Sequence, residues 1–344
     1  MIKLKDAKIS YICGILPSKR IDNFDNIYFS DREKRKIIDI SGIRNRYILN
    51  REHGETMLDL YKQAAAKVLG DLKWSTEEIS GIIVVSQNHE FKMPITAALL
   101  QDELGISKKC FAYDVVLGCS AYAYGLFLAM NHISKECKKV LLFVGDPVND
   151  FVYPKNKHSA LLFSDSGSCT AIEYCQEEEA SFIFETDGSG RDMIMVSDGG
   201  SRNPINIHSF DEYQEGDSVN IKACMKMKGL EVFNFVCSSI PNNIDKILQL
   251  NSLKVSDISR FYLHQANYYA LVQIKRKLNI KDEQFASNIN KYGNCGGVSL
   301  AILLSEEKLN LENVILSGFG VGLSICTIYL KKIHCKTALL FSKI

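Results

Sequence analysis

Apolar and polar positions alternate along the chain in a way that predicts strands separated by helices. Short apolar runs that favour strands occur at residues 81–85, 111–116 and 140–144. Segments with helical periodicity surround them, at residues 55–69, 94–104 and 120–133, with Pro94 in a first-turn position that proline tolerates. Because helices that connect such strands cover both faces of a sheet, the pattern predicts a layered α/β fold.

The second half of the chain repeats the pattern of the first half. Three pairs of segments match in order: 72–88 with 253–267, 118–129 with 293–304, and 138–146 with 312–320. The two members of each pair lie 174 to 181 residues apart, which is about half the chain. We therefore expect an internal duplication, with one half over residues 1–175, a second over 176–344, and buried helices between two sheets.

Composition excludes several classes of function. The 41 Lys and Arg residues balance 40 Asp and Glu residues, so no overall charge would attract nucleic acid. No stretch approaches the roughly 18 apolar residues of a membrane span, and the charged N-terminus does not fit a signal peptide. The 11 cysteines include no CxxC pair, and no histidine spacing suggests a metal site. We expect a cytoplasmic protein with reduced thiols, no metal and no membrane insertion.

Cys119 is the first candidate for chemistry. It lies in FAYDVVLGCSAYAYGLFLAM, which predicts a strand, a tight turn at Gly118 and then a helix. A thiol at a helix start faces free backbone N–H groups and the positive end of the helix dipole. Both favour the thiolate, which is the nucleophilic form, so the setting favours a catalytic cysteine over a buried structural one.

His264 and Asn294 are the second and third candidates. His264 ends an apolar run in FYLHQAN, and Asn294 lies in the glycine-rich segment YGNCGG. Alone, each is typical of a hydrogen-bonded core histidine or a turn asparagine. In the duplication, however, the Cys119 and Asn294 loops are equivalent, and His264 follows the strand equivalent to residues 81–85. Packing of the two halves about a pseudo-twofold axis would bring all three residues together.

These motifs resemble those of the β-ketoacyl-acyl-carrier-protein synthase III family of the thiolase superfamily. The resemblance extends from about residue 41 to 327 and includes SGIRNRYI, GCSAYAYGL, LHQAN, YGNCGG and GFGVGLS. It implies a five-layered αβαβα thiolase fold, a homodimer and an acyltransferase. It also implies acyl-CoA or acyl-carrier-protein thioesters as substrates and no further cofactor.

The resemblance assigns a role to each candidate residue. Cys119 is the nucleophile that takes an acyl group from a thioester. His264 and Asn294 hold the enolate that forms when a malonyl-type thioester loses CO₂. The backbone N–H groups of Cys119 and Val321 form the oxyanion hole. Met93 lies in the segment that, in the family, reaches into the acyl tunnel of the partner subunit.

Several positions depart from the family pattern. The Trp and Arg with which the family grips CoA are replaced here by Lys36 and Ile40, and a further Arg and Lys by Tyr269 and Asn234. Neutral side chains cannot replace a cationic phosphate clamp, which indicates a different donor or carrier and a specialised rather than housekeeping pathway. Residues 331–344 extend past the usual end of the family, as an edge strand or a disordered end.

The same residues are compatible with more than one reaction. The leading hypothesis is decarboxylative condensation of the acyl group on Cys119 with a malonyl-carrier thioester. Its rival is an acyltransferase of the same fold that passes this acyl group to a sugar amine, a hydroxyl or another small acceptor, with His264 as general base. A third class is a non-catalytic partner subunit, from which loss of Cys119 or His264 would be expected.

Overall fold

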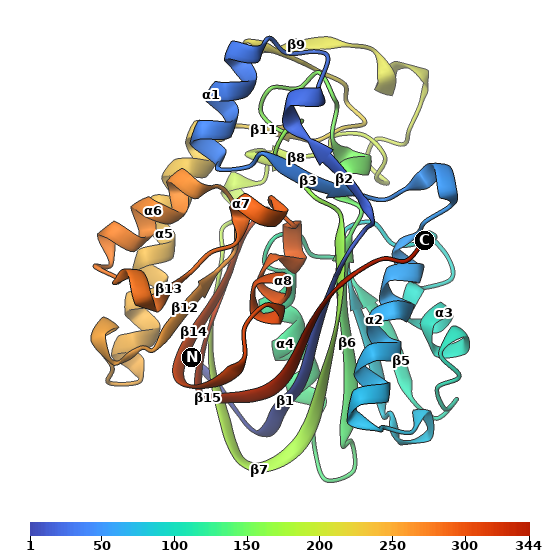
Figure 1. Cartoon of the computed structure of the whole chain (residues 1–344), viewed down its shortest axis with the longest axis vertical. Helices are drawn as coiled ribbons and strands as arrows, with labels where there is room; N and C mark the ends of the chain where they lie inside the picture. The colour runs from blue at the N-terminus through green and yellow to red at the C-terminus, as the bar shows by residue number, and fades with distance from the viewer.

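Nine strands form one bent sheet in the computed structural model, which describes all residues from Met1 to Ile344. The strand order is β13-β12-β14-β15-β1-β7-β6-β4-β5. The strands are β1 (Ile2–Leu16), β4 (Gly81–Val85), β5 (Phe111–Val115), β6 (Lys139–Asp146), β7 (Ser166–Thr186), β12 (Arg260–Leu263), β13 (Phe285–Ala286), β14 (Leu309–Gly320) and β15 (Ser324–Phe341). Figure 1 shows how the long strands β1, β7 and β15 curve across the lower part of the molecule.

The two halves of this sheet have the same topology. In the first half, β4 pairs in parallel with β5 and β6, β6 pairs antiparallel with β7, and β7 pairs antiparallel with β1. In the second half, β12 pairs in parallel with β13 and β14, β14 pairs antiparallel with β15, and β15 pairs antiparallel with β7. The strand β7 serves both halves, so the position 175/176 lies inside a continuous strand.

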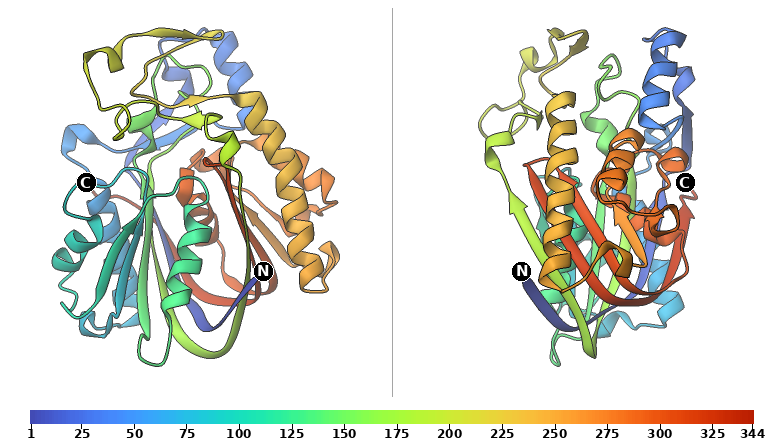
Figure 2. Two further views of the ribbon diagram at one scale, coloured as in Figure 1. Left: turned by 180° about the vertical axis from the view of Figure 1, so that it is seen from behind. Right: turned by 90° about the vertical axis from the view of Figure 1, so that its left-hand side faces the viewer.

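Helices form three further layers around and between the two halves of the sheet (Figure 2). The helices α2 (Met57–Leu72) and α3 (Thr96–Glu103) cover the first half, and α5 (Gly229–Leu250) and α6 (Tyr268–Lys277) cover the second. The central layer consists of α4 (Ala121–His132) and α8 (Ser299–Ser305), which contact strands of both halves. The structure therefore confirms the five-layered αβαβα thiolase fold.

The smaller elements lie at one end of the sheet, at the top of Figure 1. They are α1 (Asp31–Ser41), α7 (Ile289–Tyr292), β2 (Lys19–Asp22), β3 (Asn45–Ile48), β8 (Ile194–Met195), β9 (Tyr213–Glu215), β10 (Ser218–Asn220) and β11 (Lys226–Met227). These segments surround the carboxyl ends of β4 and β12, where ligand sites of α/β sheets usually lie.

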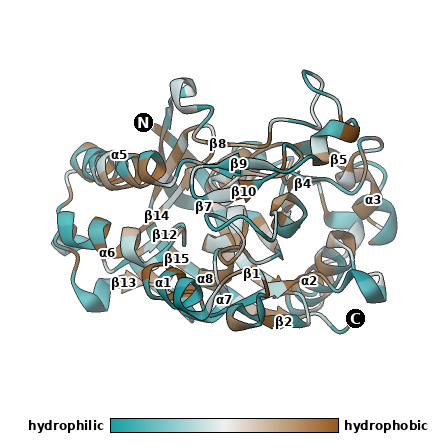
Figure 3. Cartoon of the chain, turned by 90° about the horizontal axis from the view of Figure 1, so that it is seen from above, coloured by the Kyte–Doolittle hydropathy of each residue, from teal (hydrophilic) through white to brown (hydrophobic).

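The sequence pattern explains the difference between the outer and the central helices. The buried residues of α2 are spaced by three and four positions, as in an amphipathic helix that packs on a sheet. The outer helices carry both hydrophilic and hydrophobic residues in Figure 3. By contrast, α4 is apolar on nearly all sides, because it is buried between the two halves of the nine-stranded sheet, where two separate sheets were expected. The helix predicted over 94–104 begins at Thr96, so Pro94 precedes it rather than lying in its first turn.

The residues after Leu330 form a strand. The strand β15 continues to Phe341, and residues 336–341 pair in parallel with residues 11–16 of β1. The Phe341 ring lies 5.5 Å from the ring of Tyr47 and 6.4 Å from that of Tyr292, measured between centroids. The tail is therefore ordered, but it continues β15 between β14 and β1 instead of forming the expected edge strand.

Replacing Phe341 tests the contribution of this strand to stability. Phe341→Ala removes a half-exposed ring from two aromatic contacts, so we expect the free energy of unfolding to fall by about 1–2 kcal/mol. Lys343→Ala, at an exposed position of the same tail, is the control and should change it by less than about 0.5 kcal/mol. Urea denaturation measures both, and equal stabilities of the two variants would contradict the packing role of Phe341.

Candidate active site

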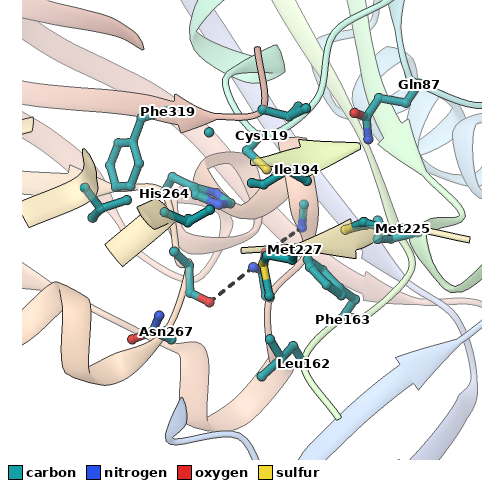
Figure 4. Close-up of a pocket in the computed structure, with 18 residues that line it drawn as sticks. Gln87, Cys119, Leu162, Phe163, Ile194, Met225, Met227, His264, Asn267 and Phe319 are labelled. Atoms are coloured by element: carbon teal, nitrogen blue, oxygen red, sulfur yellow. Dashed lines mark hydrogen bonds between the residues drawn. The ribbon is translucent and has the colours of Figure 1, made fainter. Parts of the chain in front are cut away.

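A cavity of about 90 Å³ lies where the two halves of the fold meet (Figure 4). Its wall is largely apolar and includes Val148, Leu162, Phe163, Ile194, Met225, Met227, Val232, Val236 and Phe319. Cys119, His264 and Asn294 all line this cavity, as does Val321. The structure thus brings together, in one apolar cavity, the three side chains that the duplication pattern predicted to converge.

Cys119 lies in the turn between β5 and α4, and glycines make room for it. A Cβ on Gly118 would lie 2.2 Å from Val321 Cγ1 and 2.4 Å from Gln87 Oε1. A Cβ on Gly320 would lie 2.4 Å from Cys119 Cβ, and φ at this residue is +155°. At Gly320 a side chain would displace Cys119 itself, and φ favours glycine, whereas at Gly118 a side chain would displace Val321 and Gln87.

The Asn294 loop packs directly on the Cys119 turn. A Cβ on Gly297 would lie 2.5 Å from the carbonyl oxygen of Gly118 and 2.7 Å from Ala121 Cβ. The loop is also bonded to the segment before β7, where Asn294 N–H donates to the Leu162 carbonyl (3.0 Å) and Ser164 N–H donates to the Asn294 carbonyl (2.9 Å). The two equivalent loops are therefore in contact, as packing about a pseudo-twofold axis requires.

Burial and the nearby backbone act on the pKa of the Cys119 thiol in opposite directions. Burial raises its pKa to about 11, and hydrogen bonds from the backbone N–H groups of Val321 and of Cys119 itself lower the pKa by less. The sequence favoured the thiolate, because it placed Cys119 beside a helix start. The structure opposes that expectation, since burial of the thiol raises its pKa by more than the backbone donors lower it.

The imidazole of His264 is neutral near pH 7, as its buried setting predicts. Burial lowers its pKa to about 4, and a weaker hydrogen bond with the Gly296 backbone acts in the opposite direction. The ring is held on one side by Ser299, whose Oγ lies 2.7 Å from Nδ1. The edge of Phe319 contacts it at 5.4 Å between centroids.

The side-chain amide of Asn294 has a fixed orientation. Its Oδ1 accepts a hydrogen bond from Gly296 N–H (2.9 Å), and its Nδ2 donates to the Ala266 carbonyl (3.1 Å). Figure 4 draws both bonds as dashed lines. An amide nitrogen carries two hydrogens, so the second Nδ2 hydrogen is available to a group in the cavity.

The backbone at Val321 is fixed by two serines. Ser324 Oγ donates to the Val321 carbonyl (2.9 Å) and lies 2.8 Å from Ser120 Oγ. The two serines therefore fix the backbone next to Val321, whose N–H is one of the groups that lower the pKa of Cys119.

Met93 lies apart from the cavity. It is 86% exposed, on the loop between β4 and α3, together with the exposed side chains of Phe91 and Ile95. Since the structure contains one chain, the contact of Met93 with a partner's acyl tunnel stays a prediction.

Three residues of the site were not predicted from the sequence. Gln87 lines the cavity, Ser324 holds the Val321 backbone, and Ser299 bonds to His264. Ser299 follows Asn294 by five positions at a helix start, but no motif in the sequence distinguishes it from a capping serine.

No group of three His, Cys, Asp or Glu side chains is arranged to hold a metal ion, and no helix is both long and apolar enough to cross a membrane.

Comparisons with known proteins agree with this geometry. Residues 113–188 match the family model described as 3-oxoacyl-[acyl-carrier-protein] synthase III, and residues 248–332 match the model of its C-terminal part. A Campylobacter jejuni protein provisionally named 3-oxoacyl-[acyl-carrier-protein] synthase 3 is 32% identical, with 98% of each chain covered. The β-ketoacyl-[acyl-carrier-protein] synthase III of Streptococcus suis is 31% identical over 94% of this chain and 98% of its own.

A solved structure extends the comparison to the whole fold. The crystal structure of a 3-oxoacyl-(acyl-carrier protein) synthase from Burkholderia xenovorans superposes with a TM-score of 0.91 at 30% identity. It covers 99% of this chain and 98% of that one. The similarity therefore includes the C-terminal strand as well as the two halves.

The protonated state of Cys119 can be tested by its rate of alkylation. With a pKa of about 11, the thiolate fraction rises about tenfold for each pH unit between roughly pH 7 and 9. We expect the rate of iodoacetamide alkylation of Cys119 to rise in parallel, measured by mass spectrometry of its peptide. Cys119→Ser reports the background from the other cysteines. A rate that levels off below about pH 8 would show that the thiol is activated at rest.

Proposed function

Because the chain belongs to the 3-oxoacyl-[acyl-carrier-protein] synthase III family, we propose that it condenses an acyl group on Cys119 with a malonyl-carrier thioester. The observation that carries the proposal is the position of a thiol, a neutral imidazole and a free amide N–H around one apolar cavity. We further propose that the reaction belongs to a specialised pathway.

In the first step, Cys119 Sγ attacks the carbonyl carbon of an acyl thioester. Negative charge develops on the carbonyl oxygen, and the N–H groups of Cys119 and Val321 hold it. The bond to the carrier sulfur then breaks, and the proton of the Cys119 thiol passes to that sulfur. The position of Val321 beside Cys119 on the same cavity supports this role, because it keeps a backbone N–H near the reacting sulfur.

In the second step, a malonyl thioester loses CO₂ and its electron pair forms an enolate. The N–H groups of His264 and Asn294 hold the enolate oxygen. The enolate carbon attacks the acyl carbonyl on Cys119, a carbon–carbon bond forms and the bond to Sγ breaks. The released Cys119 thiolate then takes up a proton. The apolar wall supports this sequence by limiting access of water, which would hydrolyse the acyl-enzyme.

The low pKa of His264 favours condensation over the rival reaction. Transfer to an amine or hydroxyl needs a general base, which is most effective when its pKa is near the working pH. An imidazole with a pKa of about 4 is a weak base at pH 7, but its N–H can donate to an enolate. The presence of Cys119, His264 and Asn294 around one cavity also argues against a non-catalytic partner subunit.

The residues beside the cavity support the proposal that the acyl donor differs from the donor of the housekeeping enzymes. The rings of Tyr269 and Phe233 stack at 5.5 Å between centroids with an interplanar angle of 18°. They lie beside the cavity-lining residues Asn267 and Val232 in the sequence. Ile40 and Asn234 are exposed. Aromatic and neutral groups thus stand where the family places its cationic clamp, and they cannot pair with the phosphates of CoA.

We also propose a homodimer in which the loop around Met93 contacts the partner subunit. Phe91, Met93 and Ile95 expose apolar side chains on one loop, which is unfavourable in water unless another surface covers them.

Acylation of Cys119 tests the first step. We expect intact-protein mass spectra to show one acyl adduct after incubation with a donor from a panel of acyl-CoAs and acyl-carrier proteins. Cys119→Ala should give no adduct with the same donor. Absence of an adduct on the unmodified protein with every donor would rule out the proposed enzyme.

His264→Ala tests the second step. Because His264 acts on the enolate and not on the first acyl transfer, acylation of Cys119 should persist in this variant. Release of CO₂ from a malonyl-carrier thioester should fall by about 10²–10³-fold, as expected for loss of one oxyanion donor. Both half-reactions can be followed by mass spectrometry and by CO₂ release. Equal loss of both half-reactions would contradict the role given to His264.

A further inference from the structure

Ser299 is a buried residue next to His264, outside the wall of the cavity. It is the first residue of α8, is 2% exposed, and does not line the cavity. Its Oγ lies 2.7 Å from Nδ1 of His264, which is a short distance for a hydrogen bond between neutral groups. A buried hydroxyl so close to a ring nitrogen must either donate its hydrogen to Nδ1 or accept one from it.

A second hydrogen bond decides which group is the donor. Gln265 N–H donates to Ser299 Oγ (3.2 Å), so the hydroxyl oxygen already accepts one bond. Of the two hydrogen bonds of Ser299 Oγ, the one in which the hydroxyl can donate is the contact with Nδ1 of His264. If Nδ1 carried the hydrogen, the Ser299 hydrogen would be buried without a partner, at a cost of about 1–3 kcal/mol. Nδ1 is therefore the acceptor, and the single hydrogen of the neutral ring lies on Nε2.

The segment that holds Ser299 is itself rigid. The side chain of Gln265 donates to the Leu263 carbonyl (2.8 Å) and accepts from Ser287 Oγ (2.8 Å) and from Asn288 N–H (3.2 Å). These bonds tie the end of β12 to the segment before α7. The N–H of Gln265 consequently keeps a fixed direction toward Ser299.

From this geometry we propose that Ser299 is a positioning residue that fixes the Nε2–H tautomer of His264. The inference rests on the proposed function, in which His264 must present an N–H to the enolate oxygen. The other tautomer would present a lone pair to that oxygen and repel it. Together with the free Nδ2 hydrogen of Asn294, the Nε2 hydrogen completes a pair of donors for the same oxygen.

The tautomer can be observed directly by nitrogen NMR. In protein labelled with ¹⁵N-histidine, the signals of His264 are assigned by their loss in His264→Ala. We expect the unmodified protein to show a protonated Nε2 and a bare Nδ1. In Ser299→Ala, the preference for this tautomer should be lost, because nothing then donates to Nδ1. Signals from a protonated Nδ1 in the unmodified protein would overturn the proposal, whichever variants fold.

Kinetics separate positioning from a general effect on stability. Ser299→Ala should lower the rate of malonyl decarboxylation at least about tenfold and change the rate of Cys119 acylation less than about twofold. Ser299→Thr keeps the hydroxyl and should restore most of the rate. Ser305→Ala is the matched control, because Ser305 lies buried on the same helix and bonds to the Ala301 carbonyl (2.6 Å), away from His264.

Two results distinguish this inference from the proposed function. An unchanged tautomer and an unchanged decarboxylation rate in Ser299→Ala would overturn the inference while condensation stands. A shifted tautomer in Ser299→Ala, with no decarboxylation by the unmodified protein, would support the role of Ser299 and contradict the proposed condensation.

Discussion

The contact between the Cys119 turn and the Asn294 loop is the constraint on which the site depends. Gly297 approaches Gly118 so closely that no side chain fits between them, and the central helices α4 and α8 begin beside this contact. The contact places Cys119 from the first half of the duplication and Asn294 from the second half at one cavity. His264, at the end of β12, reaches the same cavity because its strand occupies in the second half the position that β4 occupies in the first. A larger residue at Gly297 would separate the thiol from the two groups that face it.

The apolar surroundings of the cavity determine the charge of its reactive groups. Burial raises the pKa of Cys119 and lowers the pKa of His264, so both groups are neutral near pH 7. A site of this kind stabilises charge only where it forms during the reaction, through N–H groups that are already oriented. For the stabilisation of this charge, the directions of the few hydrogen bonds in the cavity wall therefore matter more than the number of charged residues around the cavity.

The sequence predicted the features that depend on local pattern and on the duplication. The strand at 81–85 has the predicted bounds, the five layers are as expected although one continuous sheet replaces the two expected sheets, and Cys119, His264 and Asn294 line one cavity. It did not predict the direction of the Cys119 pKa shift, because burial depends on side chains from distant segments such as Met225 and Phe319. The partner of His264, Ser299, is also visible only once β12 and α8 are placed side by side, and the contact of Met93 requires a second chain.

A carbon balance in a single turnover tests the account most directly. The Cys119 acyl-enzyme, carrying a ¹³C-labelled acyl group, is mixed with a malonyl-carrier thioester in one sample and with amine and hydroxyl acceptors in another. The account predicts that one CO₂ is released for each acyl group that leaves Cys119, and that the label appears in a 3-oxoacyl carrier thioester longer by two carbons. Transfer of the label to water, an amine or a hydroxyl without release of CO₂ would contradict it.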